Sequence, residues 1–386
     1  MSKDVLLLGA TGSIGTQTID LCTQEKDFHI VGVTLASHIE VLENLLSQLP
    51  YLQYVGIKDE KKAREFHASY PQYQIYSGED INTRMVQEVP YDKVVNALVG
   101  ENGFLPSLLA LRRNKDLCLA NKESLVIGGF LLNRELDQGH GRLFAIDSEH
   151  VALAKLLKKV SREEVERMII TASGGSLRDY PREKLKDVTV EDVLHHPTWK
   201  MGKRITVDSC TMVNKGFEFI EASYLYRWDI HNISPLINDE SEVHSALLMK
   251  DNSYFFEVGP SDMRVPISYA LNEGRRVKAN YKSVDFDRKC SLNFRKFEKE
   301  RYPLFSLVLK TYEKGGTAMA FFNAVDEECI KAFVDKKISY LTLISSITDL
   351  VENRIILVPD PDENDILETD KKAREITKDY LLSLEK

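Results

Sequence analysis

Apolar runs alternate with amphipathic stretches over the first 145 residues, and this alternation predicts parallel strands connected by helices. The chain enters an apolar run at residues 5–8, and a glycine-rich turn and a helix-like pattern follow it. A second apolar run lies at 29–35, and residues 93–129 repeat the order strand, helix, strand. Repeated units of this kind build a doubly wound parallel sheet, so we expect an α/β domain in this part of the chain.

The C-terminal part of the chain, from about residue 299, shows helical rather than strand periodicity. Apolar positions recur at helical spacing in "RYPLFSLVLKTYEKGG", "AFFNAVDEECIKAFVDKKI", "YLTLISSITDLVENR" and "TDKKAREITKDYLLSLEK". These four stretches predict a small helical domain. Residues 359–365, "PDPDEND", are typical of a solvated linker, and residues 276–298 form a connection of mixed composition.

The composition is that of a globular protein and argues against several partners. Hydrophobic residues make up 43% and charged residues 28% of the chain, while the net charge of −8 argues against a nucleic-acid partner. The five cysteines include no CxxC pair, so neither a zinc site nor a disulfide framework is indicated. No apolar stretch approaches a membrane span, and the first apolar run is too short for a signal peptide. We therefore expect a cytoplasmic protein with no membrane partner.

Three glycines after the first apolar run predict a nucleotide site. Gly9, Gly12 and Gly15 follow the GxxGxxG variant of the dinucleotide fingerprint, placed after a strand and before a helix. Glycine at these positions permits a tight turn, in which a pyrophosphate meets backbone N–H groups at the helix N-terminus. The alternative is a plain strand-to-helix turn.

Two other strand ends carry polar residues that a nucleotide site would use. The second strand ends at Ala36 without the acid that usually holds an NAD ribose, which favours NADP with Ser37 and His38 near the 2′-phosphate. A later strand ends in "NKE" at 121–123, where ligands bind in parallel sheets. The alternative for that segment is a helix N-cap with a solvated Lys–Glu pair.

The stretch "AIDSEHVAL" at 145–153 places two acids two positions apart. In a strand, Asp147 and Glu149 would share one face and Ser148 the other, whereas in a turn all three side chains would converge. Two neighbouring carboxylates raise each other's pKa unless a cation or a proton lies between them. The alternative is a solvated acidic turn.

The middle of the chain supplies further polar residues on a predicted strand end and helix. "IITASGGSLRD" is a strand running into the small-residue turn 173–176, which either wraps an anion or is a bare turn. In "SCTMVNKGFEFIEASYLY" the apolar periodicity is helical, so Asn214, Lys215 and Glu218 share one side. An i,i+3 salt bridge is possible, but with Ser209 this group also suits a sugar phosphate, and its oxygen ligands suit Mg²⁺ or Mn²⁺.

At this point the sequence resembles the 1-deoxy-D-xylulose 5-phosphate reductoisomerase family, whose members use NADPH and a divalent metal in the non-mevalonate isoprenoid pathway. The resemblance is carried, in the family's order from residue 5 to about 330, by "GATGSIG", "LANKESLV", "AIDSEH", "TASGGSLRD", "HHPTWKMGKRITVDSCTMVNKGFEFIEA", "VHSALL", "DMRVPI" and "NAVDEE". It implies the conversion of 1-deoxy-D-xylulose 5-phosphate to 2-C-methyl-D-erythritol 4-phosphate by rearrangement and NADPH-dependent reduction. It also implies a homodimer.

The resemblance implies a role for individual positions. The metal ligands fall on Asp147, Glu149 and Glu218, with Mg²⁺, Mn²⁺ or Co²⁺ as the metal, and Lys122 and His196 join them as residues expected to act in catalysis. The expected substrate contacts are Ser148, Ser173, His196, Ser209, Asn214 and Lys215, of which Ser173, Ser209, Asn214 and Lys215 surround the phosphate. A flap near 195–204 carries Trp199 and Met201. The expected cofactor contacts are Thr11, Gly12, Ser13, Ile14, Ser37, Asn121, Lys122, Glu123, Gly202 and Met263.

The predicted fold class is α/β with three domains. A Rossmann-like, doubly wound NADPH-binding domain spans 1–147, an α+β catalytic domain 148–275, a linker 276–298 and a C-terminal helical domain 299–386. Two segments depart from the family pattern, 36–38 ("ASH") and 238–241 ("NDES"), which puts the 2′-phosphate contacts and the role of Ser241 in doubt.

Two other classes of protein are alternatives to a reductoisomerase. One is a semialdehyde-type dehydrogenase, which would need a catalytic thiol, and Cys210 is the cysteine near the predicted site. The other is a non-catalytic sensor of nucleotides or sugar phosphates, which would not need three acids at Asp147, Glu149 and Glu218.

Overall fold

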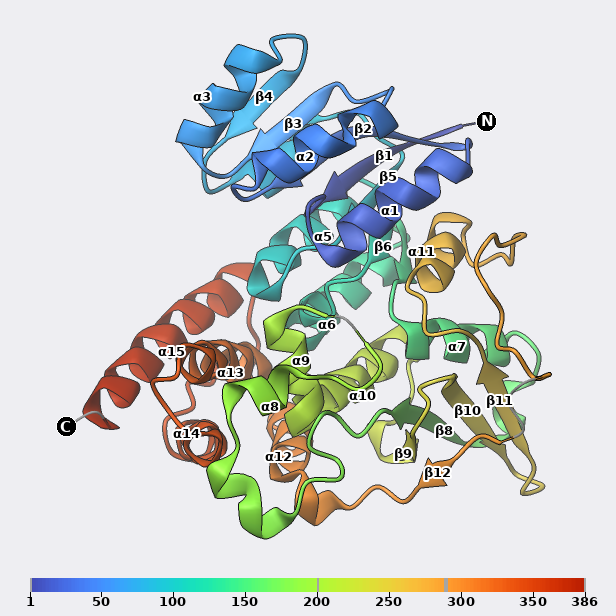
Figure 1. The fold of residues 1–386 in the computed structure, drawn as a ribbon, viewed down its shortest axis with the longest axis vertical. Coiled ribbons are helices and arrows are strands. Elements are labelled where there is room, and N and C mark those ends of the chain that lie inside the picture. Colours follow the sequence, from blue (N-terminus) through green and yellow to red (C-terminus); the bar gives the residue numbers. More distant parts are fainter. Residues whose placement is uncertain (1, 200, 288–290, 385–386) are drawn as a thin grey trace. The chain divides into compact units, whose positions relative to one another are not determined.

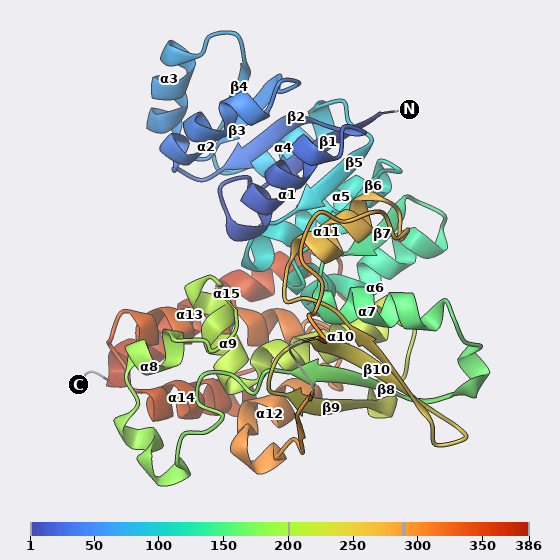
Figure 2. The same ribbon diagram turned by 45° about the vertical axis from the view of Figure 1, so that its right-hand side comes forward.

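The computed structural model describes residues 2–199, 201–287 and 291–384, and these divide into two compact units. The first unit comprises Met1–Ser124, Phe130–Val151 and Asp262–Ala279. The second unit comprises Leu125–Gly129, Ala152–Ser261 and Asn280–Lys386 (Figures 1 and 2).

A parallel sheet forms the centre of the first unit. Its seven strands within the described residues have the order β4-β3-β2-β1-β5-β6-β7, and each neighbouring pair is parallel. The chain starts near the middle, builds outward on one side and then crosses to the other, so the order reverses between β1 and β5. In such sheets ligands bind at that reversal, beyond the carboxyl ends of the strands. The strands are β1 (Lys3–Leu8), β2 (Phe28–Leu35), β3 (Tyr54–Ile57), β4 (Gln74–Ser77), β5 (Lys93–Asn96), β6 (Asp116–Leu119) and β7 (Arg142–Ala145).

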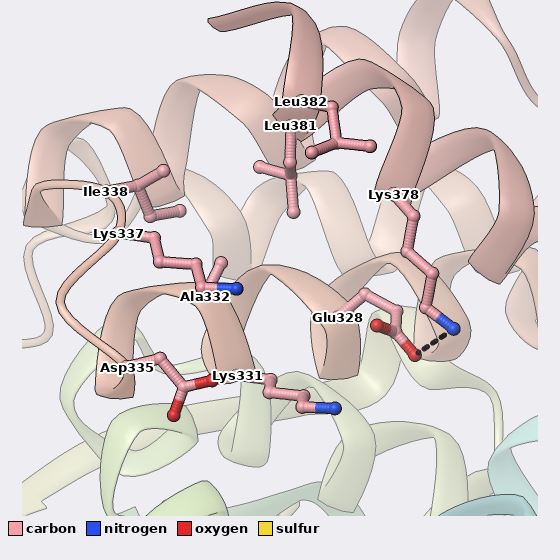
Figure 3. Close-up of a pocket in the computed structure, with 9 residues that line it drawn as sticks. All are labelled: Glu328, Lys331, Ala332, Asp335, Lys337, Ile338, Lys378, Leu381 and Leu382. Carbon is pink, nitrogen blue, oxygen red and sulfur yellow. Dashed lines mark ion pairs between the residues drawn. The ribbon is translucent and has the colours of Figure 1, made fainter. Parts of the chain in front are cut away.

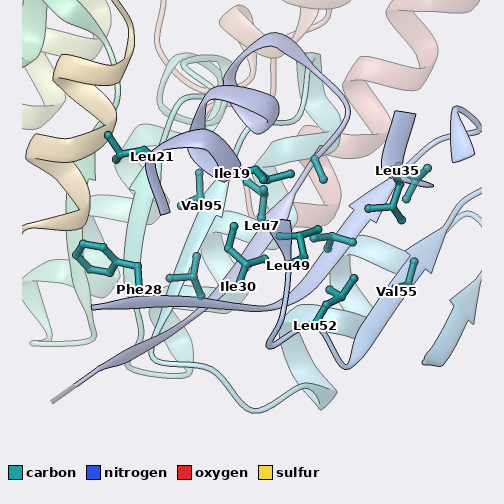
Figure 4. Close-up of a cluster of buried hydrophobic side chains, with 14 of the residues drawn as sticks. Leu7, Ile19, Leu21, Phe28, Ile30, Leu35, Leu49, Leu52, Val55 and Val95 are labelled. Carbon is teal, nitrogen blue, oxygen red and sulfur yellow. The ribbon is translucent and has the colours of Figure 1, made fainter. Parts of the chain in front are cut away.

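Helices cover both faces of this sheet, which explains why its central strands are apolar on both sides. One buried cluster holds Leu7 of β1 and Val55 of β3 together with Ile19 of α1 and Leu49 (Figure 4). On the other face lies Met85 of α4, since an added Cβ at Gly32 would meet it together with Leu6. The helices are α1 (Ser13–Gln24), α2 (Ile39–Leu45), α3 (Glu60–Ser69), α4 (Ile81–Glu88), α5 (Phe104–Arg112) and α11 (Arg264–Leu271).

The second unit contains a mixed sheet with the strand order β11-β10-β8-β9-β12. Only β8 and β9 pair in parallel, and the other neighbours among the described strands are antiparallel. The strands are β8 (Val165–Ala172), β9 (Ile233–Asn238), β10 (Val243–Met249), β11 (Tyr254–Val258) and β12 (Phe294–Arg295). One face packs Met168, Ile170 and Leu247 against helices, where the rings of Phe219 and Phe305 meet edge to face at 5.2 Å.

Helices complete the second unit, and the last four form the C-terminal helical group, with α13, α14 and α15 packed together (Figure 1). The helices are α8 (Val190–Leu194), α9 (Lys203–Thr211), α10 (Val213–Tyr226), α12 (Pro303–Tyr312), α13 (Ala318–Val334), α14 (Tyr340–Asn353) and α15 (Glu363–Leu384). Two further helices, α6 (Glu123–Asp137) and α7 (Ser148–Leu157), contain residues of both units.

The α/β fold class and the four C-terminal helices are as predicted. The solvated linker 359–365 is shorter than expected, because α15 already begins at Glu363. The division into domains at 1–147, 148–275, 276–298 and 299–386 stays a prediction. Within the described residues, no helix combines the length and the apolar character needed to cross a membrane.

Candidate active site

The glycine turn between β1 and α1 has the geometry that a pyrophosphate needs. Gly9 has a φ of +83°, and a Cβ there would lie 2.7 Å from the carbonyl oxygen of Ala97. A Cβ on Gly15 would lie 2.3 Å from the Gly9 oxygen. Gly12 is the N-cap of α1, and neither a capping side chain nor an acid occupies the first turn. The turn is therefore closely packed, and the helix presents its first N–H groups and positive dipole end to an anion.

The other expected cofactor contacts in the first unit surround this turn or follow neighbouring strands. Thr11, Ser13 and Ile14 lie on it, with Ser13 exposed. Ser37 and His38 directly follow β2, and the His38 ring lies 3.0 Å from a carboxylate oxygen of the exposed Glu40. Met263 caps α11 and packs against the first unit's core, and Gly202 belongs to the second unit.

Asn121 and Glu123 hold a neighbouring turn in shape. The Asn121 side chain is buried and donates to the carbonyl oxygens of Leu98 and Gly100 at 3.1 and 2.9 Å. Glu123 accepts a hydrogen bond from the Asn121 side chain at 3.0 Å and another from the Gly100 N–H at 3.3 Å. Gly103 is required here because a Cβ would lie 2.2 Å from the Asn121 side-chain oxygen. This structural role of Asn121 was not anticipated from the sequence.

Lys122 makes a buried ion pair with the first of the two neighbouring acids. Its Nζ donates to Oδ2 of Asp147 at 2.8 Å, and both residues are at most 9% exposed. A buried ion pair of this kind carries a large penalty for losing either partner. Sequence reasoning placed the two residues on the same rim but did not predict their pairing.

Asp147 and Glu149 converge because the strand ends before them. β7 stops at Ala145, and α7 begins at Ser148, so the alternation of a strand does not apply. Oδ1 of Asp147 accepts the Glu149 N–H at 3.2 Å, and the Ser148 hydroxyl donates to the Glu149 carboxylate. Carboxylate oxygens of Asp147 and Glu149 lie within 4.8 Å of each other. This spacing and these oxygen donors fit a hard divalent cation.

In the second unit, the small-residue turn after β8 is closed and folded onto a helix. Gly174 and Gly175 both have positive φ, +86° and +73°. A Cβ on Gly175 would lie 2.7 Å from the carbonyl oxygen of Ser209 in α9, so the turn lies directly against the backbone of that helix. The arrangement puts Ser173 and Ser209 in neighbouring segments, as the predicted phosphate site requires.

His196 is bound to this turn in a defined protonation state. Its Nδ1 accepts the N–H groups of Thr198 and Trp199 at 3.2 and 2.9 Å, so the ring proton resides on Nε2. Burial, assisted by the charge of Arg178, lowers the pKa of His196 to about 4 and keeps the ring neutral. Nε2 lies 3.0 Å from the Ser173 hydroxyl oxygen.

Ser173 therefore accepts two hydrogen bonds and keeps its own proton for another partner. Besides the His196 ring, its oxygen accepts the Gly175 N–H at 3.1 Å. The hydroxyl proton then points elsewhere, which suits donation to an anionic ligand oxygen.

The predicted helix at 209–226 is interrupted by one residue. Met212 has a φ of +63°, a left-handed conformation, so α9 ends at Thr211 and α10 starts at Val213. A non-glycine residue in this region is uncommon and is frequently found at functional sites. The break separates Ser209 on α9 from the polar group on α10.

The polar group on α10 has the predicted shared face. Oε1 of Glu218 accepts from the Asn214 amide at 2.5 Å, and Oε2 accepts from the Lys215 ammonium. Lys215 and Glu218 are 3% and 2% exposed, so this is a buried ion pair and not a solvated one. Lys215 and Glu218 thus form the i,i+3 salt bridge that the sequence allowed, and the same two residues belong to the predicted site.

The predicted flap lies between α8 and α9. Trp199 and Met201 are half-buried, and the exposed Gly202 is the N-cap of α9. Lys200 of the flap and 288–290 of the linker lie outside the described residues.

Arg178 was not anticipated from the sequence. Its guanidinium donates to the carbonyl oxygens of Ser173 at 2.8 Å and Asp239 at 3.0 Å, so it joins the phosphate turn to the divergent segment 238–241. Asp239 accepts two hydrogen bonds from Arg295 of β12. The signal was available, because an arginine follows the small-residue turn by only two positions.

A separate cavity of about 290 Å³ lies in the C-terminal helical group of the second unit (Figure 3). Its lining includes the apolar side chains of Leu381 and Leu382, and two other lining residues, Glu328 and Lys378, pair at 3.6 Å. It is lined by none of the predicted site residues.

The strand order and glycine turn of the first unit define a dinucleotide-dependent enzyme of the Rossmann-like class. Three family models match the chain in succession: 1-deoxy-D-xylulose 5-phosphate reductoisomerase over residues 5–129, its C-terminal domain over 143–226, and the DXP reductoisomerase C-terminal domain over 258–376. The 1-deoxy-D-xylulose 5-phosphate reductoisomerase of Halothermothrix orenii is 38% identical over 379 residues, 97% of each chain. This protein therefore belongs to the 1-deoxy-D-xylulose 5-phosphate reductoisomerase family.

Solved structures agree with this assignment over the whole chain. The reductoisomerase of Zymomonas mobilis in complex with NADPH has a TM-score of 0.89 and 29% identity, covering 99% of both chains. A DOX-P reductoisomerase in complex with NADPH, fosmidomycin and magnesium has a TM-score of 0.93 and 28% identity, covering 100% of this chain and 99% of that one. Family and fold are thus as the sequence predicted.

Proposed function

We propose that Asp147, Glu149 and Glu218 are the ligands of the divalent cation in this reductoisomerase. The enzyme converts 1-deoxy-D-xylulose 5-phosphate to 2-C-methyl-D-erythritol 4-phosphate in the non-mevalonate isoprenoid pathway, using NADPH and a divalent metal. The convergence of Asp147 and Glu149 carries the proposal, because their carboxylate oxygens lie within 4.8 Å. When bound, the cation supplies Lewis-acid stabilisation of charge on substrate oxygens.

Lys122 orients the first ligand. Its ammonium occupies one oxygen of Asp147 at 2.8 Å, and the N–H of Glu149 occupies the other at 3.2 Å. The Asp147 carboxylate is therefore fixed in direction beside a second acid. Lys122 thus takes part in catalysis by holding a ligand, besides its expected contact with the cofactor.

The phosphate group of the substrate binds on the second unit, at Ser173, Ser209, Asn214 and Lys215. Support comes from the left-handed glycine turn packed on α9 and from the Ser173 hydroxyl, whose proton points away from its two donors. Lys215 supplies the positive charge. His196 supplies a neutral Nε2–H that fixes Ser173, and Ser148 contacts the substrate from beside Glu149.

The nicotinamide cofactor binds on the first unit at the reversal of strand order. Support comes from the uncapped α1 terminus and from the three residues directly after β2, Ala36, Ser37 and His38, which include no acid. The flap residues Trp199 and Met201 exclude water from the reacting carbon atoms, which protects the aldehyde before NADPH reduces it. We further propose a cytoplasmic homodimer and the functional division 1–147, 148–275, 276–298 and 299–386.

The deciding experiment is NADPH oxidation with 1-deoxy-D-xylulose 5-phosphate, with Mn²⁺ and after chelation, in the wild type and in Glu149→Gln. We expect oxidation that needs the metal, and a Glu149→Gln variant that needs far more Mn²⁺ for half-maximal rate. Glu166→Gln, an exposed acid on β8, is the matched control. An unchanged Mn²⁺ requirement in Glu149→Gln would remove Glu149 from the ligand set, while turnover without any metal would overturn the proposal as a whole.

A further inference from the structure

Two buried carboxyl groups flank one guanidinium in the second unit, away from the predicted metal ligands. Asp208 lies on α9 and Asp326 on α13, and they are 4% and 1% exposed. Nε of Arg204 lies 3.6 Å from Oδ2 of Asp208, and Nη2 of the same residue lies 3.9 Å from Oδ2 of Asp326. Two acids from different helices thus face the same buried cation.

The closest contacts of Arg204 go to other groups. Its Nη1 pairs with Oε1 of Glu327 at 2.5 Å, and its Nη2 donates to the Asn323 side-chain oxygen at 2.6 Å. Neither carboxyl oxygen of Asp326 has a hydrogen-bond partner. The charge of Arg204 is therefore divided among three acids, and Asp326 receives the smallest share of it.

The neighbouring helix does not supply the missing positive charge. Arg374 on α15 pairs with Asp370 on its own helix at 2.7 Å, and with Glu327 and Glu328 of α13 at 2.6 and 3.3 Å. Lys378 reaches only Glu328, at 3.6 Å. Arg374 and Lys378 thus pair with Asp370, Glu327 and Glu328, and neither makes an ion pair with Asp326 among the described residues. A buried carboxylate without a donor or cation of its own is too costly to stay ionised.

The electrostatic environment indicates the same acid as the geometry does: Asp326 is the carboxyl group that stays protonated. Burial and the charge of Asp208 raise the pKa of Asp326 well above its usual range, Glu327 adds to this, and Arg204 opposes it. Cys329, one turn further along α13, is buried, and burial raises the pKa of its thiol so that it stays neutral. The proton is therefore best placed on Asp326, facing Asp208.

The position of this pair connects it to the substrate site. α9 begins directly after the flap and carries Ser209 in its last turn. We propose that Asp326 keeps its proton opposite Asp208, and that Arg204, which faces both acids, is a positioning residue that fixes α9, and with it Ser209, against α13. The positioning role rests on the proposed placement of Ser209 at the substrate phosphate, whereas the proton on Asp326 does not.

Loss of the proton would place two negative charges on opposite sides of the contact between α9 and α13. Because like charges in a buried site repel strongly, α9 would shift away from α13. The expected effect on the reaction is weaker substrate binding at alkaline pH, with the turnover of bound substrate less affected.

The proton is tested by comparing Asp326→Asn with the wild type in urea unfolding at several pH values. Asparagine has nearly the same shape but binds no proton, so it removes the titration and keeps the packing. The raised pKa of Asp326 adds stability to the wild type that is lost as the pH rises above the usual aspartate range. The ratio of the folding constant of Asp326→Asn to that of the wild type should therefore increase by about tenfold for each pH unit in this range. Asp335→Asn, an exposed acid at the end of α13, should keep a constant ratio.

Infrared spectra give a second reading of the same proton. The wild type should show the C=O stretch of a protonated carboxylic acid near neutral pH, and Asp326→Asn should lack it. A ratio of folding constants that does not change with pH, together with no such band, would overturn the assignment of a proton to Asp326. If Asp326→Asn does not fold, Asp208→Asn provides a second comparison, since loss of the Asp208 charge should lower the pKa of Asp326 and weaken the pH dependence of unfolding.

The positioning role is tested by the pH profile of KM for 1-deoxy-D-xylulose 5-phosphate. In the wild type KM should rise at alkaline pH, and this rise should be absent in Asp326→Asn and present in Asp335→Asn. The same alkaline rise in all three proteins would restrict the pair to a structural role and overturn the positioning part. Absence of turnover in every protein at every pH would instead contradict the proposed function, and the unfolding result would still stand.

Discussion

The ammonium of Lys122 lies 2.8 Å from Oδ2 of Asp147, and the two side chains are nearly inaccessible to solvent. Lys122→Ala leaves a buried acid without its cation, so we expect the free energy of unfolding to fall by about 3 kcal/mol in the presence of a chelator. Added Mn²⁺ should recover part of this loss, because the metal replaces the missing positive charge. This change in the free energy of unfolding is measured by urea unfolding of the wild type and Lys122→Ala, with a substitution of an exposed lysine, Lys61→Ala, as the control. An equal loss with and without Mn²⁺ would contradict the metal assignment of Asp147.

Glu218→Gln should remove turnover and spare the cofactor. Several kcal/mol of transition-state stabilisation depend on the cation, so we expect kcat to fall by about 10³-fold or more. NADPH binding, measured by fluorescence titration, should stay within about twofold of the wild type, since the proposed cofactor contacts lie almost wholly in the first unit. A parallel loss of both properties would argue against the proposed division of roles.

The neutral state of His196 predicts a defined acid dependence of stability. Its pKa in the folded protein is about 4, below the ordinary value of 6.5, so the unfolded chain binds the proton first. The stability due to neutral His196 is complete above about pH 6.5 and is lost as the pH falls toward 4. The melting temperature of the wild type should therefore fall more steeply in this window than that of His196→Asn. Parallel curves for the two proteins would show that the ring is not held neutral.

His38 provides a test of cofactor preference. It is exposed and lies where the 2′-phosphate of NADPH is expected, so His38→Ala should raise KM for NADPH by about fivefold, the worth of one exposed polar contact. KM for NADH, which has no such phosphate, should not change. Steady-state kinetics with NADPH and with NADH measure both KM values. An equal increase in both would show that the 2′-phosphate of NADPH does not bind at His38.

Cys210→Ala should leave the rate unchanged. The thiol is 1% exposed and burial raises its pKa, so it is neither accessible nor ionised. A small loss of stability, about 1 kcal/mol, is expected from the vacated volume. A large loss of rate without a change in KM would revive the dehydrogenase alternative.

Periodicity and motif spacing predicted most of the fold, because strands buried on both faces and amphipathic helices leave strong marks in a sequence. The glycine turn at Gly9 and the shared face of Asn214 and Glu218 follow directly from such local rules. The break at Met212 does not, since a left-handed methionine is imposed by packing around it and leaves no signature in its neighbours.

Contacts between distant segments account for what sequence reasoning missed. The pairing of Lys122 with Asp147, and the hydrogen bond from Arg178 to Asp239, each join segments tens of residues apart. Residue types alone do not specify such partners. Asn121 is a further case: its contact with the cofactor stays a prediction, and its side chain also donates to backbone carbonyl oxygens of a turn about twenty residues earlier in the chain, which its residue type does not specify.

The close approach of Gly175 to the backbone of Ser209 has a consequence for how this chain can evolve. Any side chain at position 175 would have to displace α9, so the turn and the helix cannot drift independently. A relative that has lost the glycine at 175 should therefore also carry compensating substitutions along α9. Such correlated substitutions would show that the turn and the helix change together.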